Sequence, residues 1–211
     1  MKTYDQKNEI IRRQIISAAN EYKAKLAGHV FLYVYGDSYF EVVFFVDRFL
    51  HLTGVNSRLN GQDFYDKATS AILTTKQFFY DADHLYVNAK KKLPCLIALP
   101  SLTDRLVCVV RNLPTKTLTY KLGVTNIDFT LGLTENTDLN GNIINDWYVP
   151  RTLRVRDHSI EKSPYSEFID FIFSKDASMN KYDTISFCSE DCKAPESIRC
   201  LLSDELVSKL F

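Results

Sequence analysis

Hydrophobic residues in the first part of the chain recur at helical spacing and then give way to two apolar runs. Over Asn8–Leu26 the apolar positions lie three or four residues apart, which predicts one amphipathic helix. The runs Val30–Tyr35 and Tyr39–Val46 flank a Gly36-Asp37-Ser38 turn and predict a β-hairpin. Both runs are apolar on both faces, so we expect the hairpin to be well covered.

The middle of the chain mixes helical periodicity with breaks. The segment Asp47–Gly61 carries glycines and is predicted to be irregular. A second helix is predicted over Gln62–Phe79, with Asn60 as its N-cap. Two prolines interrupt Asp81–Pro100, for which no element is predicted, and apolar spacing favours a third helix over Leu102–Arg111.

From Thr117 onward the hydrophobic period changes to two. Alternation over 118–122, 127–131 and 147–155, with apolar runs at 167–174 and 183–187, predicts about five strands. The predicted fold is therefore α+β, with N-terminal helices and the hairpin packed on an antiparallel β-meander. We expect one domain over 1–211, with 1–28 an N-terminal helix and 188–211 a C-terminal extension that contains a short helix.

Composition limits the classes of function. The 26 basic and 26 acidic residues give a formal net charge of +0, which argues against a general nucleic-acid coat but not against a small basic cleft. No apolar leader follows Met1, and the apolar runs are too short to span a bilayer. Five cysteines are an odd number, so we expect reduced thiols and a cytoplasmic protein with no membrane partner.

Metal and cofactor motifs are missing from the sequence. It contains no phosphate-binding glycine loop, no His-Glu-x-x-His and no Gly-x-Ser-x-Gly, so we expect no cofactor. A zinc site at Cys188, Cys192 and Cys200 is the alternative that we weighed. Their spacing is wider than in common zinc sites and no histidine lies near them in sequence, which favours free cysteines and no metal.

Three polar clusters are candidates for chemistry. His51 lies in the run Phe49-Leu50-His51-Leu52-Thr53-Gly54, where apolar flanks would fix the backbone and the imidazole could transfer protons. The alternative is a histidine hydrogen-bonded within the fold, which the spacing alone favours.

The second and third clusters lie on predicted strands. Strict alternation puts Arg151 on the apolar face of its strand, where a charge must be paired or line a site; Pro150 could instead mark a bulge that shifts the face. Arg154 is either solvated or part of a phosphate-binding strip. Lys175 falls on the same side as Phe171 and Phe173 and either stabilises a phosphate or simply ends the strand.

These clusters resemble the blocks of a phage- and mobile-element-associated nuclease family with the barnase–EndoU–colicin–RelE-like fold. The resembling segments are Arg48–Val55, Val149–Val155 and Phe171–Lys175, within a resemblance that spans His29–Phe187. It implies helices packed on an antiparallel sheet and metal-independent cleavage of RNA. The family pattern falls on His51, Thr53, Arg151 and Lys175, and Thr152 stands where the pattern has a serine.

The mechanism implied is transesterification by the 2′-hydroxyl of RNA. His51 would be the general base or acid, Arg151 and Lys175 would stabilise the phosphate, and Thr53 would orient the phosphate or His51. Arg154 and Thr152 would bind substrate, and Tyr120 or Tyr182 would be the second proton-transfer group, with nothing in the sequence to select between them.

The expected partners are RNA and, for a toxin or effector, a neutralising or host protein. The alternative function is a catalytically inert module that uses the same cleft to bind RNA or a host-defence protein.

Overall fold

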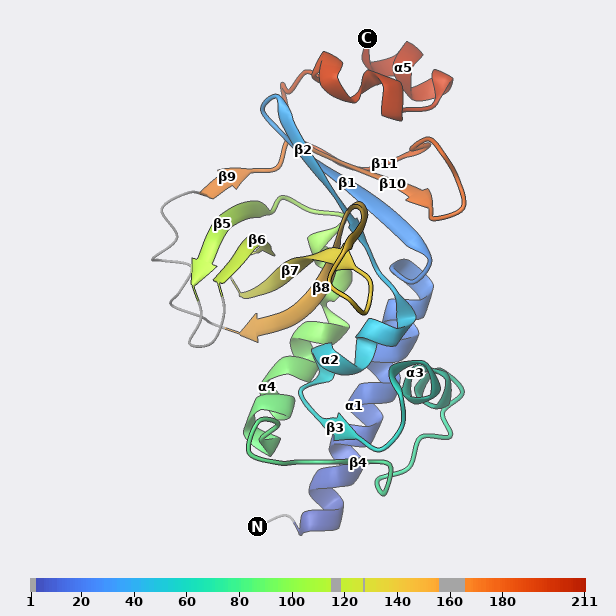
Figure 1. Cartoon of the computed structure of the whole chain (residues 1–211), viewed down its shortest axis with the longest axis vertical. Helices are drawn as coiled ribbons and strands as arrows, with labels where there is room; N and C mark the ends of the chain where they lie inside the picture. The colour runs from blue at the N-terminus through green and yellow to red at the C-terminus, as the bar shows by residue number, and fades with distance from the viewer. Residues whose placement is uncertain (1–2, 115–118, 127, 156–165) are drawn as a thin grey trace.

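The computed structural model describes residues 3–114, 119–126, 128–155 and 166–211, and of 113–114 and 119–120 only the backbone (Figure 1). The helices are α1 Tyr4–Lys25, η1 Val46–Arg48, α2 Phe49–Thr53, α3 Gly61–Thr69, α4 Tyr86–Ile97, η2 Leu99–Leu102, η3 Glu196–Leu201 and α5 Asp204–Leu210, where η marks a 3₁₀ helix. The strands are β1 His29–Tyr35, β2 Ser38–Val43, β3 Asn56–Ser57, β4 Phe78–Phe79, β5 Cys108–Pro114, β6 Thr119–Thr125, β7 Phe129–Thr137, β8 Ile143–Val155, β9 Ser166–Phe168, β10 Phe171–Asp176 and β11 Thr184–Cys188.

One large curled sheet organises the α+β fold. Its order is β11-β10-β1-β2-β8-β7-β6-β5-β9, while β3 and β4 form a separate pair. In the part of the chain that is described, the large sheet thus has nine strands, and the prediction of about five was wrong. The hairpin β1–β2 belongs to this sheet instead of packing on it, because β2 pairs in parallel with β8 over a short stretch. A parallel pairing of two residue pairs leaves no pattern in the sequence.

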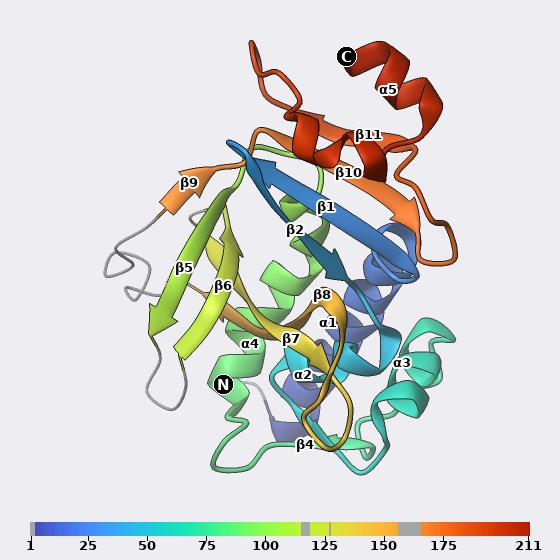
Figure 2. The ribbon, with the colours of Figure 1, turned by 45° about the horizontal axis from the view of Figure 1, so that its top comes forward.

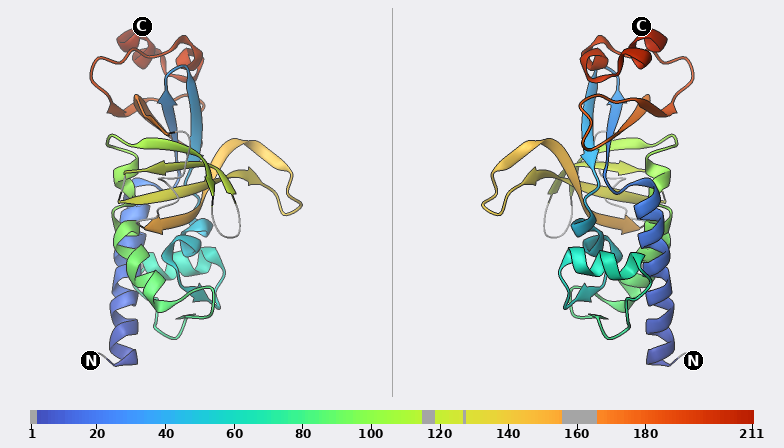
Figure 3. Two further views of the ribbon diagram at one scale, coloured as in Figure 1. Left: turned by 90° about the vertical axis from the view of Figure 1, so that its left-hand side faces the viewer. Right: turned by 90° about the vertical axis from the view of Figure 1, so that its right-hand side faces the viewer.

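The two faces of the sheet bury separate hydrophobic clusters. Helices α1 to α4 cover the face that carries Phe31, Tyr33 and Leu131. The other face, around Val30 and Phe173, is covered by η3 and α5, which lie above β10 and β11 (Figure 2). The β7–β8 hairpin stands out from the body of the protein (Figure 3).

The first helix and the hairpin confirm the periodicity argument. Thr3 and Gln6 form a capping box at the start of α1, and Ile11, Ile15 and Tyr22 are fully buried along one stripe. Strand β1 lies where the first apolar run predicted it, whereas β2 ends at Val43 instead of Val46, where η1 begins. The C-terminal segment is helical, as predicted.

In the middle of the chain one predicted helix is too long, one helix was not predicted and one predicted helix is a strand. The helix predicted over Gln62–Phe79 begins with Asn60 as its N-cap, as expected, but ends at Thr69, because Ala71 adopts a left-handed conformation (φ 58°) and β4 then pairs with β3. The segment read as broken contains α4, since Pro94 is exposed while Ala89 and Leu93 anchor the helix in the core. The third predicted helix, over 102–111, is largely replaced by β5, because β-branched Val109 and Val110 pair with β6.

Among the described helices, none combines the length and apolar character that a membrane crossing requires. The five cysteines are all free thiols in the structure.

Candidate active site

His51 lies on α2, a helix of five residues that contacts α3, α4 and β8. Phe49 and Leu52 are fully buried on either side of it, and Gly54 ends the helix with a φ of 79°. The His51 ring lies on the remaining side of α2 and keeps an exposed surface. The apolar neighbours therefore hold the backbone while the imidazole stays accessible. The segment 47–61, predicted to be irregular, thus contains the helix that carries His51.

Arg151 is the extra residue of a β-bulge in β8. Pro150 pairs with Leu133 and Thr152 pairs with Gly132, which leaves Arg151 without an opposite residue on β7. Its side chain is exposed, whereas Val149 is buried in one cluster and Leu153 in the other. Strict alternation was therefore the wrong reading of this strand, and the bulge at Pro150 is what frees the guanidinium from the apolar face.

Arg48 and Arg151 line one hollow of about 350 Å³ beside α2. Arg48 comes from the end of η1, immediately before the helix that carries His51. The remaining lining residues are on β7 and β8: Thr134, Glu135, Thr137, Val149 and Pro150. Two guanidinium groups beside a hollow provide the donors that a phosphate group needs.

The pKa of His51 is lowered below its ordinary value of about 6.5. Removal from water by the surrounding protein is the main cause, followed by the positive charges of Arg151 and Arg48, while Asp47 opposes the shift. A lowered pKa favours the neutral imidazole, which has a nitrogen lone pair that can accept a proton. The effect of the Arg151 charge on this pKa also indicates that His51 and Arg151 lie near each other.

This proximity makes a prediction about titration. Replacing Arg151 with alanine removes a positive charge that disfavours the imidazolium, so the pKa of His51 should rise. NMR titration of the His51 ring would measure the shift, with His29, at the start of β1, as internal control. An unchanged His51 titration would contradict the arrangement described here.

A second histidine, His84, belongs to the same region. Its Nδ1 lies 2.9 Å from Asp81 Oδ1, and a proton on its ring adds to the causes that lower the His51 pKa. Asp81 is itself held by Asn56, whose Nδ2 donates a hydrogen bond of 2.7 Å. Hydrogen bonds from Asn56 and His84 lower the pKa of Asp81 to about 2. His84 was not among the residues predicted from the sequence, although the spacing Asp81-x-x-His84 before a helix was a signal for a carboxylate–imidazole pair.

A further pair of basic residues extends the site along β8 and α4. Burial and the nearby charge of Arg154 lower the pKa of Lys92. The Lys92 stem packs against α2, since a Cβ placed on Gly54 would lie only 3.0 Å from Lys92 Cδ. We call Arg48, Arg151, Arg154 and Lys92 the basic strip; its residues lie on η1, β8 and α4, the elements that contact α2.

The two threonines of the predicted site differ in burial and in their contacts. Thr53 is fully buried; its hydroxyl donates to the Leu50 carbonyl at 2.7 Å and accepts from the Val55 amide at 3.3 Å. These bonds stabilise the end of α2, so Thr53 positions the helix rather than facing the hollow. Thr152 is half-buried and pairs with Gly132 next to the bulge.

Lys175 is not brought to His51 and Arg151. Lys175 lies on the same side of β10 as Phe171 and Phe173, as predicted, and it pairs with Val30 of β1. This residue is only 8% exposed. Its Nζ donates to the Asn180 carbonyl at 3.3 Å and lies 4.6 Å from the ring centre of Tyr182. Tyr182 is fully buried and its hydroxyl donates to Glu41. The Tyr120 side chain lies outside the described residues.

Comparison with curated proteins and with solved structures found no match. Comparison with protein families gave the family described as phage-Barnase-EndoU-ColicinE5/D-RelE like nuclease4, which matches residues 14–191. The matched stretch contains His51, His84, Arg151 and the whole basic strip, and it ends before η3 and α5. The chain therefore belongs to the phage-Barnase-EndoU-ColicinE5/D-RelE like nuclease family.

Proposed function

We propose that this nuclease is an endoribonuclease that cleaves RNA without a metal ion, using the 2′-hydroxyl of the substrate as nucleophile. The observation that supports it most is that the charges of Arg151 and Arg48, the two arginines that line the hollow, help to lower the pKa of His51. RNA supplies its own nucleophile, so the protein needs only a base, an acid and groups that stabilise a charged phosphate.

The proposed steps assign one role to each group. His51 accepts the proton of the 2′-hydroxyl as the bond from O2′ to phosphorus forms. Arg151 and Arg48 donate hydrogen bonds to the phosphate oxygens as negative charge develops on them. The bond from phosphorus to O5′ then breaks, and His84 donates a proton to the leaving O5′.

His84 is the better second proton-transfer group on geometric grounds. Tyr182 is fully buried against Glu41, whereas His84 keeps part of its ring accessible and is fixed by Asp81. With Nδ1 occupied by the carboxylate, Nε2 is the nitrogen that can exchange a proton with substrate.

The other basic residues would bind the flanking backbone. Arg154 and Lys92 continue the strip beyond Arg151, where phosphates next to the scissile one would lie. Cleavage of cellular RNA harms the cell that contains the enzyme, so a toxin or effector role and a neutralising protein partner stay part of the proposal.

Purified protein incubated with RNA in EDTA is the direct test of this function. Cleavage is expected in EDTA at the rate seen with magnesium present, and an all-deoxy strand of the same sequence should stay intact because it lacks the nucleophile. A strict requirement for added magnesium or manganese, or equal cleavage of the deoxy strand, would overturn the mechanism. Binding of RNA without cleavage would favour the inert module.

A further inference from the structure

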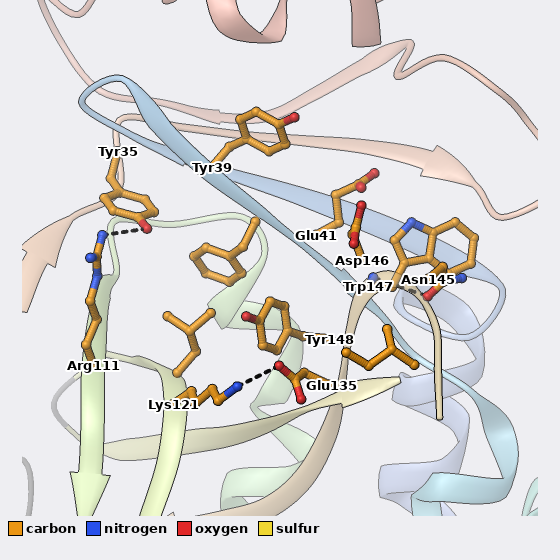
Figure 4. Close-up of a pocket in the computed structure, with 13 residues that line it drawn as sticks. Tyr35, Tyr39, Glu41, Arg111, Lys121, Glu135, Asn145, Asp146, Trp147 and Tyr148 are labelled. Carbon is orange, nitrogen blue, oxygen red and sulfur yellow. Dashed lines mark hydrogen bonds and ion pairs between the residues drawn. The ribbon is translucent and has the colours of Figure 1, made fainter. Parts of the chain in front are cut away.

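A second, larger hollow of about 580 Å³ lies between the β1–β2 hairpin and strands β5 to β8 (Figure 4). Its walls come from β1, β2, β5, β6, β7 and β8, and five of its residues are aromatic: Tyr35, Tyr39, Phe40, Trp147 and Tyr148. We call this hollow the aromatic cleft. Phe40 and Tyr35 are only 5% and 6% exposed, and Arg111 lies over the Tyr35 ring. The exposed Tyr39 and the half-buried Trp147 and Tyr148 therefore provide the faces on which an unpaired base can stack.

Most of the charged side chains in the aromatic cleft are already hydrogen-bonded to a neighbour. Arg111 Nη2 donates to the Tyr35 hydroxyl at 2.9 Å, and Lys121 Nζ donates to Glu135 Oε1 at 2.8 Å (Figure 4). Glu41 accepts from Tyr182, and Asp146 is exposed beside Trp147. Each carboxylate oxygen has more than one acceptor position, so these acids can still accept N–H donors from a ligand.

The aromatic cleft adjoins the hollow beside His51. Glu135 lines both, and the neighbouring residues of β7 and β8 continue from one to the other. A chain of nucleotides whose phosphate lies at Arg48 and Arg151 would therefore have a neighbouring base at the cleft.

We propose that the aromatic cleft binds one unpaired base of the RNA substrate and prefers a base with an exocyclic amino group. This rests on the proposed function, because it makes the cleft a subsite of the same enzyme. The base would stack on Tyr39, Trp147 or Tyr148, and its amino group would donate to the carboxylates.

The distribution of charge favours a base over a phosphate in this position. Three carboxylates, Glu41, Glu135 and Asp146, and two cations, Arg111 and Lys121, line the cleft, and Lys175 Nζ lies 6.0 Å from the centre of the Trp147 ring. The basic strip instead gathers the positive charges of Arg48, Arg151, Arg154 and Lys92. A phosphate is therefore attracted more strongly to the strip than to the cleft, where the charges balance. Carboxylates accept hydrogen bonds from amino groups of bases, which uracil lacks.

The chain carries its own probe for this test. Trp147 is the single tryptophan of the sequence and lines the cleft. Titration with cytidine monophosphate in EDTA should change its fluorescence in a saturable manner, and uridine monophosphate should bind at least about fivefold more weakly. Asp146→Asn and Glu135→Gln should remove the preference for cytidine, whereas Glu205→Gln, exposed on α5, should leave it unchanged.

Mononucleotides contain no scissile linkage, so this result does not depend on catalysis. If the protein binds cytidine monophosphate preferentially but does not cleave RNA, the cleft is supported as a base-binding site and the endoribonuclease function is rejected. Cleavage of RNA with no saturable Trp147 response, or equal binding of the two nucleotides, would overturn the cleft as a base site. Melting temperatures should confirm that Asp146→Asn and Glu135→Gln both fold. If one of them does not, the nucleotide preference of the other variant is the test.

Discussion

His51→Ala is expected to lower the rate of RNA cleavage by about 10²–10⁴-fold, the usual contribution of a general acid–base group. The fold should be unaffected, because Phe49 and Leu52 anchor α2 in the core while the His51 ring is exposed. Cleavage rate and melting temperature would be measured on one preparation.

The matched control for this variant is His29→Ala. His29 lies at the start of β1 and its ring contacts the Ala27 carbonyl at 3.2 Å, away from the basic strip. It should retain wild-type cleavage. A His51 variant with lowered melting temperature but unchanged cleavage by its folded molecules would show that the histidine is structural, and its catalytic assignment would be dropped.

Arg151→Ala is expected to lower cleavage by about 10²–10³-fold, as does removal of one donor to a developing charge. Arg151→Lys should recover only part of the loss, because an ammonium group keeps the charge but not the planar pair of donors. Since Arg151 is exposed on a bulge, both variants should melt as the wild type does.

Arg13→Ala serves as the control for loss of a positive charge. Arg13 lies on α1, its side chain is 76% exposed, and it pairs with Glu9. It should cleave RNA normally. Equal losses in Arg13→Ala and Arg151→Ala would mean that net charge alone matters, and that the hollow is not the phosphate site.

Periodicity predicted the elements whose stability comes from one continuous apolar stripe or run. Helix α1 and strands β1 and β2 are of this kind. It failed where tertiary contacts override local signals. Pro94 lies within α4 because the buried side of that helix avoids the proline, and Val109 pairs in β5 although its spacing matched a helix.

The site was predictable only in part for a similar reason. His51 and Arg151 lie about a hundred residues apart in sequence, and the pairing of β8 with β7 together with the bulge brings the arginine to α2. The resemblance named both residues, but no local pattern separates them from Lys175, which lies on the other face of the sheet. His84 was missed because its partner Asp81 and its neighbour His51 become informative only once the chain is folded.

The most direct measurement of the central claim is the chemistry of the ends left on RNA cut in the presence of EDTA. Attack by the 2′-hydroxyl, with His51 as base, predicts a 2′,3′-cyclic phosphate on one fragment and a 5′-hydroxyl on the other. Mass spectrometry of a short defined RNA distinguishes these products from those of hydrolysis by an activated water. Fragments with 3′-hydroxyl and 5′-phosphate ends would contradict the account, because no 2′-hydroxyl attack can produce them.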